Sequence, residues 1–118
     1  MKGIGIDIES VKRFENLERK KNKLFFKKIY SNTELDYCFK SKNIPLELAK
    51  FFCLKEAIYK SLMSINVTNL FINDIKLYHL SDGSLVASTN KNINNLNIQI
   101  SFSSCKSKCI AFAYSVIQ

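Results

Sequence analysis

The 118-residue sequence contains few of the residues on which metal clusters, secretion signals and membrane spans depend. It has one histidine (His79), one proline, three glycines and no tryptophan. No run of 18 uncharged apolar residues occurs, so we expect no transmembrane helix. Asp7 interrupts the apolar N-terminal residues and no small-residue cleavage site follows, so an ordinary secretory signal is not expected. The sequence therefore predicts a cytoplasmic protein with a single domain, residues 1–118.

Cysteine is also too sparse for a structural zinc site. Cys105 and Cys109 have a spacing that suits a metal clip, but no second pair of cysteines or histidines lies near them. His79 is enclosed in an apolar, strand-like run. Since structural zinc needs four ligands at consistent spacing, we expect free thiols in a reducing compartment. These thiols belong to Cys38, Cys53, Cys105 and Cys109.

Acidic residues are scarce relative to basic ones. The chain has 18 lysines and arginines against 10 acidic residues, a formal net charge of +8, and its hydrophobic content of 47% argues against disorder. Such an excess attracts nucleic acid, an acidic protein surface or a phosphorylated cofactor, although it is also consistent with an ordinary solvated face. The densest basic segment comprises Lys12, Arg13, Arg19, Lys20, Lys21, Lys23, Lys27 and Lys28.

The first strand is predicted at residues 3–8, where small and branched residues alternate. Two glycines on one face weaken a strand unless something must approach the backbone closely. An acid on that same face is poorly explained by solubility alone. The two faces are Ile4, Ile6 and Ile8 against Gly3, Gly5 and Asp7.

The middle of the chain is predicted to be helical. From Ser10, an amphipathic helix is expected to carry Val11, Phe14 and Leu17 at three-residue spacing, and an apolar and basic stretch follows at 24–30. Ser31 and Glu34 form a capping-box signature for a helix through residue 39. The only proline, residue 45, suits the first turn of a long helix over 45–63.

The last third of the chain has the composition of strands. Residues 71–80 and 85–88 flank a turn at 81–83, and further strands are expected at 98–102 and 110–117, joined by a loop at 103–108. The predicted fold class is therefore α+β: an N-terminal strand, helices including one long helix, then antiparallel hairpins.

The long helix also carries the residues most suited to chemistry. Glu56 borders its apolar stripe, and Lys60 follows one turn later. Alone, they make an ordinary surface pair worth a few tenths of a kcal/mol. With Asp7 at the end of the first strand, however, two carboxylates and a lysine would suit Mg²⁺ shared with phosphate oxygens.

Two motifs carry a family resemblance that extends over nearly the whole chain. Gly5-Ile6-Asp7-Ile8-Glu9, followed by Lys55-Glu56-Ala57-x-x-Lys60, resembles the 4′-phosphopantetheinyl transferases. Length and motif order are similar to their small bacterial type, the holo-acyl-carrier-protein synthases. The resemblance implies a 4′-phosphopantetheinyl transferase-like fold. It also implies a homotrimer whose sites lie between neighbouring subunits. The implied reaction transfers phosphopantetheine from coenzyme A to a serine of acyl carrier protein, for fatty acid biosynthesis.

The resemblance also assigns roles to individual residues. It implies that Asp7 and Glu56 bind Mg²⁺, that Glu56 is the candidate base, and that Lys60 contacts the coenzyme A phosphates. Coenzyme A would also meet Lys50, Gly83 and Ser104. Arg13 is the best single residue for docking the acidic carrier protein, with the basic cluster around it as further candidates: Arg19, Lys20, Lys21 and Lys23.

Four positions depart from the family pattern. Ser104 replaces a histidine and Lys50 replaces an arginine. A turn lysine is lost at residues 83–85, and residues 64–66 lack the usual glycines. These changes predict an active but slower enzyme. Two alternatives stay open: a basic nucleic-acid-binding domain using residues 12–28, or a degenerate family member that binds coenzyme A without turnover.

Overall fold

The computed structural model describes all 118 residues and contains three α-helices, two 3₁₀ turns and five strands. The N-terminal strand leads into a 3₁₀ turn, the three helices follow, and the remaining strands come last, which confirms the predicted α+β class. The elements are β1 (Lys2–Ser10), η1 (Val11–Phe14), α1 (Lys23–Ile29), α2 (Asn32–Lys40), α3 (Ile44–Met63), η2 (Ile72–Asp74), β2 (Ile75–His79), β3 (Leu85–Thr89), β4 (Leu96–Ser104) and β5 (Lys108–Ile117).

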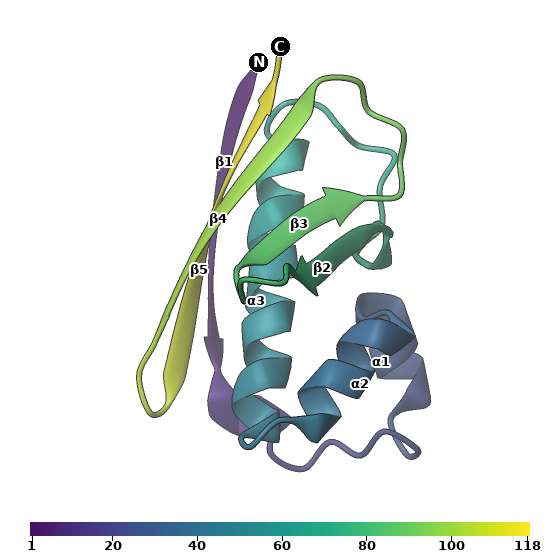
Figure 1. The fold of residues 1–118 in the computed structure, drawn as a ribbon, viewed down its shortest axis with the longest axis vertical. Helices are drawn as coiled ribbons and strands as arrows, with labels where there is room; N and C mark the ends of the chain where they lie inside the picture. The colour runs from purple at the N-terminus through teal and green to yellow at the C-terminus, as the bar shows by residue number, and fades with distance from the viewer.

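Helix α3 lies at the centre of the molecule (Figure 1). The antiparallel sheet β1-β5-β4 lies on one side of α3, and the β2–β3 hairpin and the pair α1–α2 lie on the other. The two ends of the chain meet at one end of the sheet, where the ammonium of Met1 donates a hydrogen bond to the Ile117 carbonyl at 2.7 Å. The first and last strands are thus neighbours, and both pack against α3.

Two of the helix starts follow their sequence signals. In the predicted capping box, the Ser31 hydroxyl accepts from the Glu34 amide at 3.1 Å, and the Glu34 carboxylate accepts from the Ser31 amide at 2.9 Å. At the start of α3, the Asn43 side chain accepts from the Leu46 amide at 3.3 Å, and Pro45 occupies the first turn. At both helix starts, a nearby side chain therefore accepts a hydrogen bond from a backbone amide that has no partner within the helix.

The amphipathic helix expected from Ser10 is wrong beyond its first turn. The structure has only the 3₁₀ turn η1, which buries Val11 and Phe14, followed by irregular chain in which Leu17 is partly buried. A strict three-residue apolar spacing fits 3₁₀ geometry, with its 3.0 residues per turn, better than the 3.6 of an α-helix. The basic segment 12–28 is consequently spread over η1, a loop and α1.

The strand predicted at 71–80 is also shorter than expected. Residues Ile72–Asp74 form η2 instead, because the Asp74 carboxylate accepts from the Phe71 amide at 2.8 Å and closes a turn. Strands β4 and β5 are longer than predicted, running to Ser104 and starting at Lys108, so that the expected 103–108 loop shrinks to a tight hairpin.

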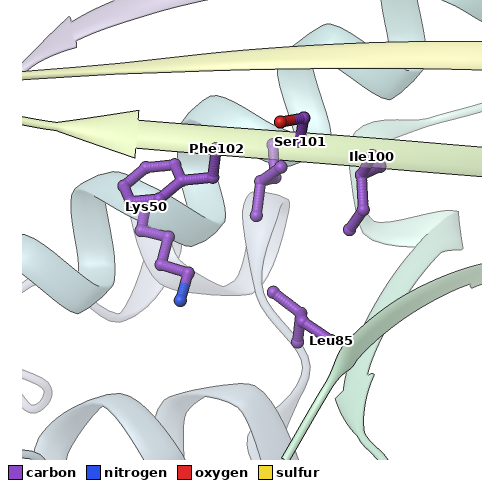
Figure 2. A pocket seen from close by; sticks show the side chains of 6 residues that line it. Lys50, Leu85, Ile100, Ser101 and Phe102 are labelled. Atoms are coloured by element: carbon purple, nitrogen blue, oxygen red, sulfur yellow. The ribbon is translucent and has the colours of Figure 1, made fainter.

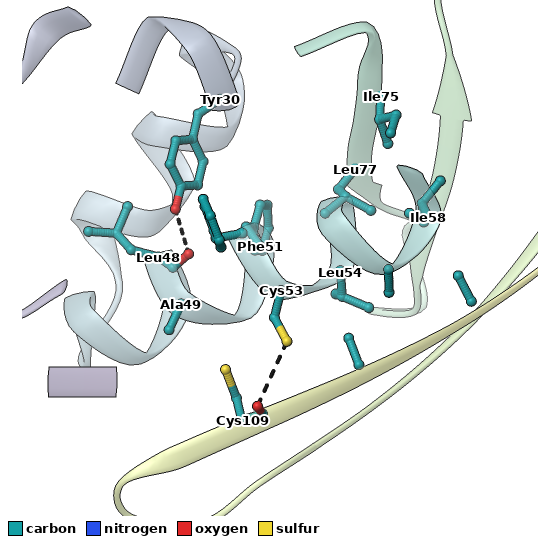
Figure 3. Close-up of a cluster of buried hydrophobic side chains, with 14 of the residues drawn as sticks. Tyr30, Leu48, Ala49, Phe51, Cys53, Leu54, Ile58, Ile75, Leu77 and Cys109 are labelled. Carbon is teal, nitrogen blue, oxygen red and sulfur yellow. Dashed lines mark hydrogen bonds between the residues drawn. The ribbon is translucent and has the colours of Figure 1, made fainter. Parts of the chain in front are cut away.

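The core lies on both flanks of α3, most of whose residues are buried. Figure 3 shows the part of this core that links α1, α3 and β5. The Tyr30 hydroxyl donates to the Leu48 carbonyl at 2.6 Å, and the Cys53 thiol lies 3.8 Å from the Cys109 carbonyl. These contacts fix the long helix against its neighbours along its first half.

The glycine face of β1 packs against α3, as the close approach expected from the sequence requires. A Cβ atom at Gly5 would lie 2.0 Å from the Ala57 carbonyl oxygen, and one at Gly3 would lie 2.1 Å from that of Ser61. The helix backbone therefore approaches the strand more closely than any side chain would allow. The isoleucine face points the other way and stays uncovered, since Ile6 is 57% exposed.

Candidate functional site

The glycine-lined contact between β1 and α3 brings the three predicted residues Asp7, Glu56 and Lys60 together. The Lys60 ammonium lies 3.0 Å from Asp7 Oδ1 and donates a second hydrogen bond to the Ile6 carbonyl at 3.1 Å. The Asp7 side chain is 12% exposed, whereas that of Lys60 is 52% exposed. The hydrogen bond that Lys60 donates to the Asp7 carboxylate raises the pKa of Lys60. A buried acid thus lies beside a solvent-facing cation.

The second oxygen of Asp7 has no partner. Asp7 Oδ2 is buried and accepts no hydrogen bond, an uncommon state for a carboxylate oxygen. Burial raises the pKa of the neighbouring Glu56, the negative charge of Asp7 raises it further, and Lys60 opposes the shift. Two carboxylates close enough to repel each other, one with an unused oxygen, form a donor set suited to a hard divalent cation.

Local contacts explain why Asp7 holds its position. The Cys53 thiol, one turn before Glu56 on α3, donates to the Asp7 carbonyl at 3.2 Å. Residues Cys53, Glu56 and Lys60 recur at helical spacing, so they share the side of α3 that faces β1. The structure contains no group of three or more His, Cys, Asp or Glu side chains that could hold a metal. A cation here would need non-protein ligands to complete its shell.

Arg13 lies next to this carboxylate pair. Its guanidinium pairs with Glu9 at 2.9 Å and lies 4.8 Å from the centre of the Phe52 ring. Phe25 stacks on Phe52 with ring centres 6.3 Å apart, and the charge of Arg13 slightly offsets the burial that raises the pKa of Glu56. Arg13 and these aromatic rings therefore form a cationic and apolar surface beside the candidate site.

The predicted coenzyme A residues Lys50, Gly83 and Ser104 lie elsewhere. Lys50 faces a hollow of about 290 Å³ between α3, β3 and β4 (Figure 2), where its ammonium lies 5.2 Å from the Phe102 ring centre. Gly83 is in the β2–β3 turn, with φ at +88° and open space around it. Ser104 is exposed at the end of β4.

Within one chain, these residues lie at separate places: Asp7 is on the edge strand β1, whereas Ser104 is on the other edge strand, β4, and Lys50 of α3 lies beside Phe102 of β4. Asp7 of β1 is paired with Ala111 of β5, and Ala111 is paired with Phe102 of β4. Two inter-strand spacings, about 10 Å, therefore separate the Asp7 edge from the Lys50 and Phe102 edge. The chain alone does not bring the two halves of the predicted site together.

The remaining basic residues divide between two locations. Arg19, Lys20 and Lys23 line a separate hollow bordered by α1, α2 and β2, and Arg19 pairs with Asp36 at 2.7 Å. Lys21 is exposed and pairs with Glu18 at 3.2 Å. Among the predicted docking residues, Arg13 is the one whose contacts adjoin the carboxylates.

Sequence reasoning missed a buried ion pair behind the site. Lys55 is fully buried and its ammonium lies 2.5 Å from Glu34 of the capping box. Lys55 also donates to the Ile29 carbonyl at 2.6 Å, and Glu34 accepts from the Leu77 amide at 2.7 Å. The sequence pattern that could have revealed this pair is the position of Lys55 on the apolar face of α3, one turn after Phe51 and three residues before Ile58.

The four cysteines differ in environment and do not form a cluster. Cys38, Cys53 and Cys109 are buried, and burial raises the pKa of Cys38 to about 12. Cys105 is exposed, and hydrogen bonds from the amides of Ser107 and Lys108 lower its pKa. Cys105 and Cys109 therefore lie in different surroundings.

This contrast predicts selective alkylation. Because the thiolate is the reactive form, brief treatment of the folded protein with iodoacetamide at neutral pH should modify Cys105 alone. The rate should reach half its maximum below pH 9.0, the ordinary thiol value. Peptide mass spectrometry measures the modification, and Cys105→Ser serves as the unreactive control. Equal labelling of Cys53 would contradict the burial described above.

The fold and the paired carboxylates define a class of protein. The sequence model of the 4′-phosphopantetheinyl transferase superfamily matches residues 3–113, and the chain belongs to this superfamily. It is 31% identical over 117 residues to a holo-[acyl-carrier-protein] synthase of Thermodesulfovibrio yellowstonii, covering 99% of this chain and 98% of that protein.

Solved structures agree with this assignment. The chain is similar to Helicobacter pylori holo-[acyl-carrier-protein] synthase in complex with coenzyme A, at 30% identity and a TM-score of 0.74, with 93% of this chain and 96% of the other covered. It is also similar to the holo-ACP-synthase of Plasmodium yoelii, at 28% identity and a TM-score of 0.72, with coverage of 96% and 92%. None of the helices has the length and apolar character needed to cross a membrane.

Proposed function

We propose that this chain is a holo-acyl-carrier-protein synthase. It transfers the 4′-phosphopantetheine group of coenzyme A to a serine of apo-acyl carrier protein and releases adenosine 3′,5′-bisphosphate. The observation that carries the proposal is the Asp7, Glu56 and Lys60 cluster in a superfamily member whose relatives bear that enzyme's name. The carrier would serve fatty acid biosynthesis in the cytoplasm, where the exposed Cys105 thiol stays reduced.

Asp7 and Glu56 fit Mg²⁺, and the unpartnered oxygen of Asp7 is the observation that supports this fit. Mg²⁺ is usually held by one or two carboxylates, with water and substrate phosphate as its other ligands. When bound, it would neutralise the pyrophosphate of coenzyme A and stabilise the leaving phosphate.

The protein's own groups supply the remaining steps. Glu56 takes the proton of the attacking serine at its carboxylate, directly or through one water molecule. Lys60 is largely exposed and turns its ammonium from Asp7 toward the coenzyme A phosphates, which it binds as a point charge. Asp7 holds Lys60 in place before the substrate arrives.

The separation of the two site halves supports a homotrimer. The edge carrying Asp7 and Glu56 would meet the edge of a neighbouring subunit that carries Lys50, Gly83 and Ser104, and coenzyme A would bind between them. The sheet face opposite α3 also leaves an apolar surface uncovered, which is typical of an interface between subunits. Its exposed residues are Ile4, Ile6, Ile8, Ile110 and Phe112.

Shared sites predict complementation between inactive variants. Glu56→Gln and Lys50→Glu subunits should each be nearly inactive alone. A trimer mixing the two restores about one intact site in three, because only one of its interfaces joins two unaltered halves. Co-expression with two different tags, followed by a transfer assay on doubly purified trimers, measures the recovery.

The matched control mixes Glu56→Gln with Asp7→Asn. Both changes lie on the same edge, so no interface regains a complete site and no activity should return. No recovery in the first mixture would show that each chain forms its site alone, whereas recovery in the control would show that Asp7 and Glu56 of one chain belong to different sites.

Docking of the carrier protein is proposed at the surface around Arg13. Its guanidinium lies over Phe52 beside Glu56, so an acidic helix bound there would bring its serine near the base. Lys21 is an exposed charge paired with Glu18 and contributes to the same electrostatic attraction. Arg19, Lys20 and Lys23 contribute long-range attraction, since their side chains border a separate hollow.

The decisive experiment is the intact mass of the carrier protein. Incubation with apo-acyl carrier protein, coenzyme A and Mg²⁺ should add one phosphopantetheine, and EDTA should prevent the addition. No addition, with coenzyme A still raising the melting temperature, would indicate a binder without turnover. No addition and no stabilisation would rule out the proposal and favour a nucleic-acid role for the basic segment.

A further inference from the structure

A strongly basic hollow lies between α1, α2 and β2, on the opposite face of α1 from the Phe25–Phe52 contact. Its volume is about 860 Å³, within the range of roughly 300–1,000 Å³ typical of small-molecule sites. We call it the basic pocket. Its charged lining residues are Arg19, Lys20, Lys23, Lys27 and Lys76.

The charges of the basic pocket are not balanced within the chain. No carboxylate lines the pocket, and its five cations come from the loop before α1, from α1 itself and from β2. Only Arg19 has an ion-pair partner, Asp36; Lys20, Lys23, Lys27 and Lys76 have none. Cations gathered from separate elements repel one another, and an anion bound between them removes that repulsion.

The pocket has a buried apolar floor beneath its cations. Phe26, Tyr30 and Leu35 line it and are almost wholly buried, and Tyr30 is fixed by its hydrogen bond to the Leu48 carbonyl. Asn73 donates to the Lys27 carbonyl at 3.3 Å, which ties α1 to η2. The start of α2 also borders the pocket, and its dipole favours negative charge there.

We propose that the basic pocket binds a polyphosphate chain, either free or as part of a nucleotide. A single phosphate would leave most of the five cations unpaired, whereas linked phosphates place several negative charges within one small volume. This site is separate from the transferase site. The carboxylates lie with Arg13 and Phe52, while Lys23 and Lys27 point to the other side of α1. The proposal does not depend on the proposed transfer reaction.

Calorimetric titration with inorganic triphosphate in EDTA tests the proposal. The test variant is Lys27→Gln/Lys76→Gln, which removes two charges from the pocket. The matched control, Lys42→Gln/Lys106→Gln, removes two exposed charges that line no part of it. Affinity should fall at least tenfold in the test variant, equal to about 1.4 kcal/mol, and stay unchanged in the control. Both variants keep the transferase site intact, so the difference between them isolates the pocket.

A parallel titration with ATP separates the two sources of the ligand. Tighter binding of ATP than of triphosphate assigns the pocket to a nucleotide, and equal binding assigns it to the phosphate chain alone. Equal losses in both variants, or no saturable binding to the unaltered protein, would overturn the proposal. So would a test variant that loses affinity for apo-acyl carrier protein while triphosphate fails to bind, because the pocket would then be a docking surface.

Discussion

Replacing Glu56 with glutamine should reduce phosphopantetheine transfer by about 100-fold to 10,000-fold, the usual contribution of a positioned general base. Glutamine keeps the size of the side chain but can neither accept the serine proton nor provide a charged ligand beside Asp7. Asp7→Asn should cause a comparable loss for two reasons. It removes the negative charge that pairs with Lys60, and it removes one of the two carboxylate oxygens, of which Oδ2 has no partner in the chain. Initial rates of carrier modification at saturating coenzyme A measure both variants.

Stability provides the control for Glu56→Gln. Since burial and Asp7 raise the pKa of Glu56 above 4.5, its charged form destabilises the folded state at neutral pH. The neutral glutamine should therefore increase the melting temperature at pH 7 in EDTA. The gain should disappear as the pH falls below 4.5, where the carboxylate is protonated in both folded and unfolded chains. An inactive variant that is also less stable at pH 7 would point to misfolding instead of lost chemistry.

The proximity of Asp7 and Glu56 could be predicted from the sequence because backbone packing between β1 and α3 determines it. Glycines at positions 3 and 5 permit close packing of a helix backbone, and that packing places the next residue on the same face, Asp7, at the edge of α3. The motif Lys55-Glu56-Ala57-x-x-Lys60 identified which helix residues would be there. Neither the glycine pattern nor the helix motif requires knowledge of contacts between side chains that are far apart in the sequence.

The placement of the basic residues could not be predicted in the same way. The sequence shows how many lysines lie between residues 12 and 28, but their direction depends on where the 3₁₀ turn ends and how α1 is rotated. Phe26 is buried and Phe25 packs on Phe52, so that rotation turns Lys23 and Lys27 away from Arg13. Tertiary packing of two aromatic rings thus decides which cations adjoin the carboxylates.

The separation of Lys50 from Asp7 has a similar cause. Both occur in motifs of the same family, which suggests a single site, but Lys50 extends from α3 toward Phe102 of β4, whereas Lys60 of the same helix contacts Asp7 of β1. β5, the last strand in sequence, lies between β1 and β4 and keeps their edges apart. Only the three-dimensional pairing of the first strand with the last shows that one chain presents two half-sites.

Breaking the buried pair between Lys55 and Glu34 should have the largest effect on stability. Lys55→Met removes the partner of a carboxylate that is almost completely buried, and loss of one member of such a pair costs about 3–5 kcal/mol. Urea denaturation followed by circular dichroism measures the loss. The control, Lys21→Met, breaks an exposed pair with Glu18 and should change the free energy of unfolding by less than about 1 kcal/mol.

The variant Glu34→Gln distinguishes loss of charge pairing from loss of packing. Glutamine fills the same space and keeps an acceptor for the Leu77 amide, but leaves the Lys55 ammonium buried without a counter-charge. Burial already lowers the pKa of Lys55 below 10.5, and Glu34 opposes that shift, so the pKa should fall further in the variant. The unfolded chain then binds more protons than the folded one, and the stability of Glu34→Gln should rise with pH toward 10.5 more steeply than that of the unaltered protein. Parallel pH curves for the two proteins would show that the pair contributes through packing alone.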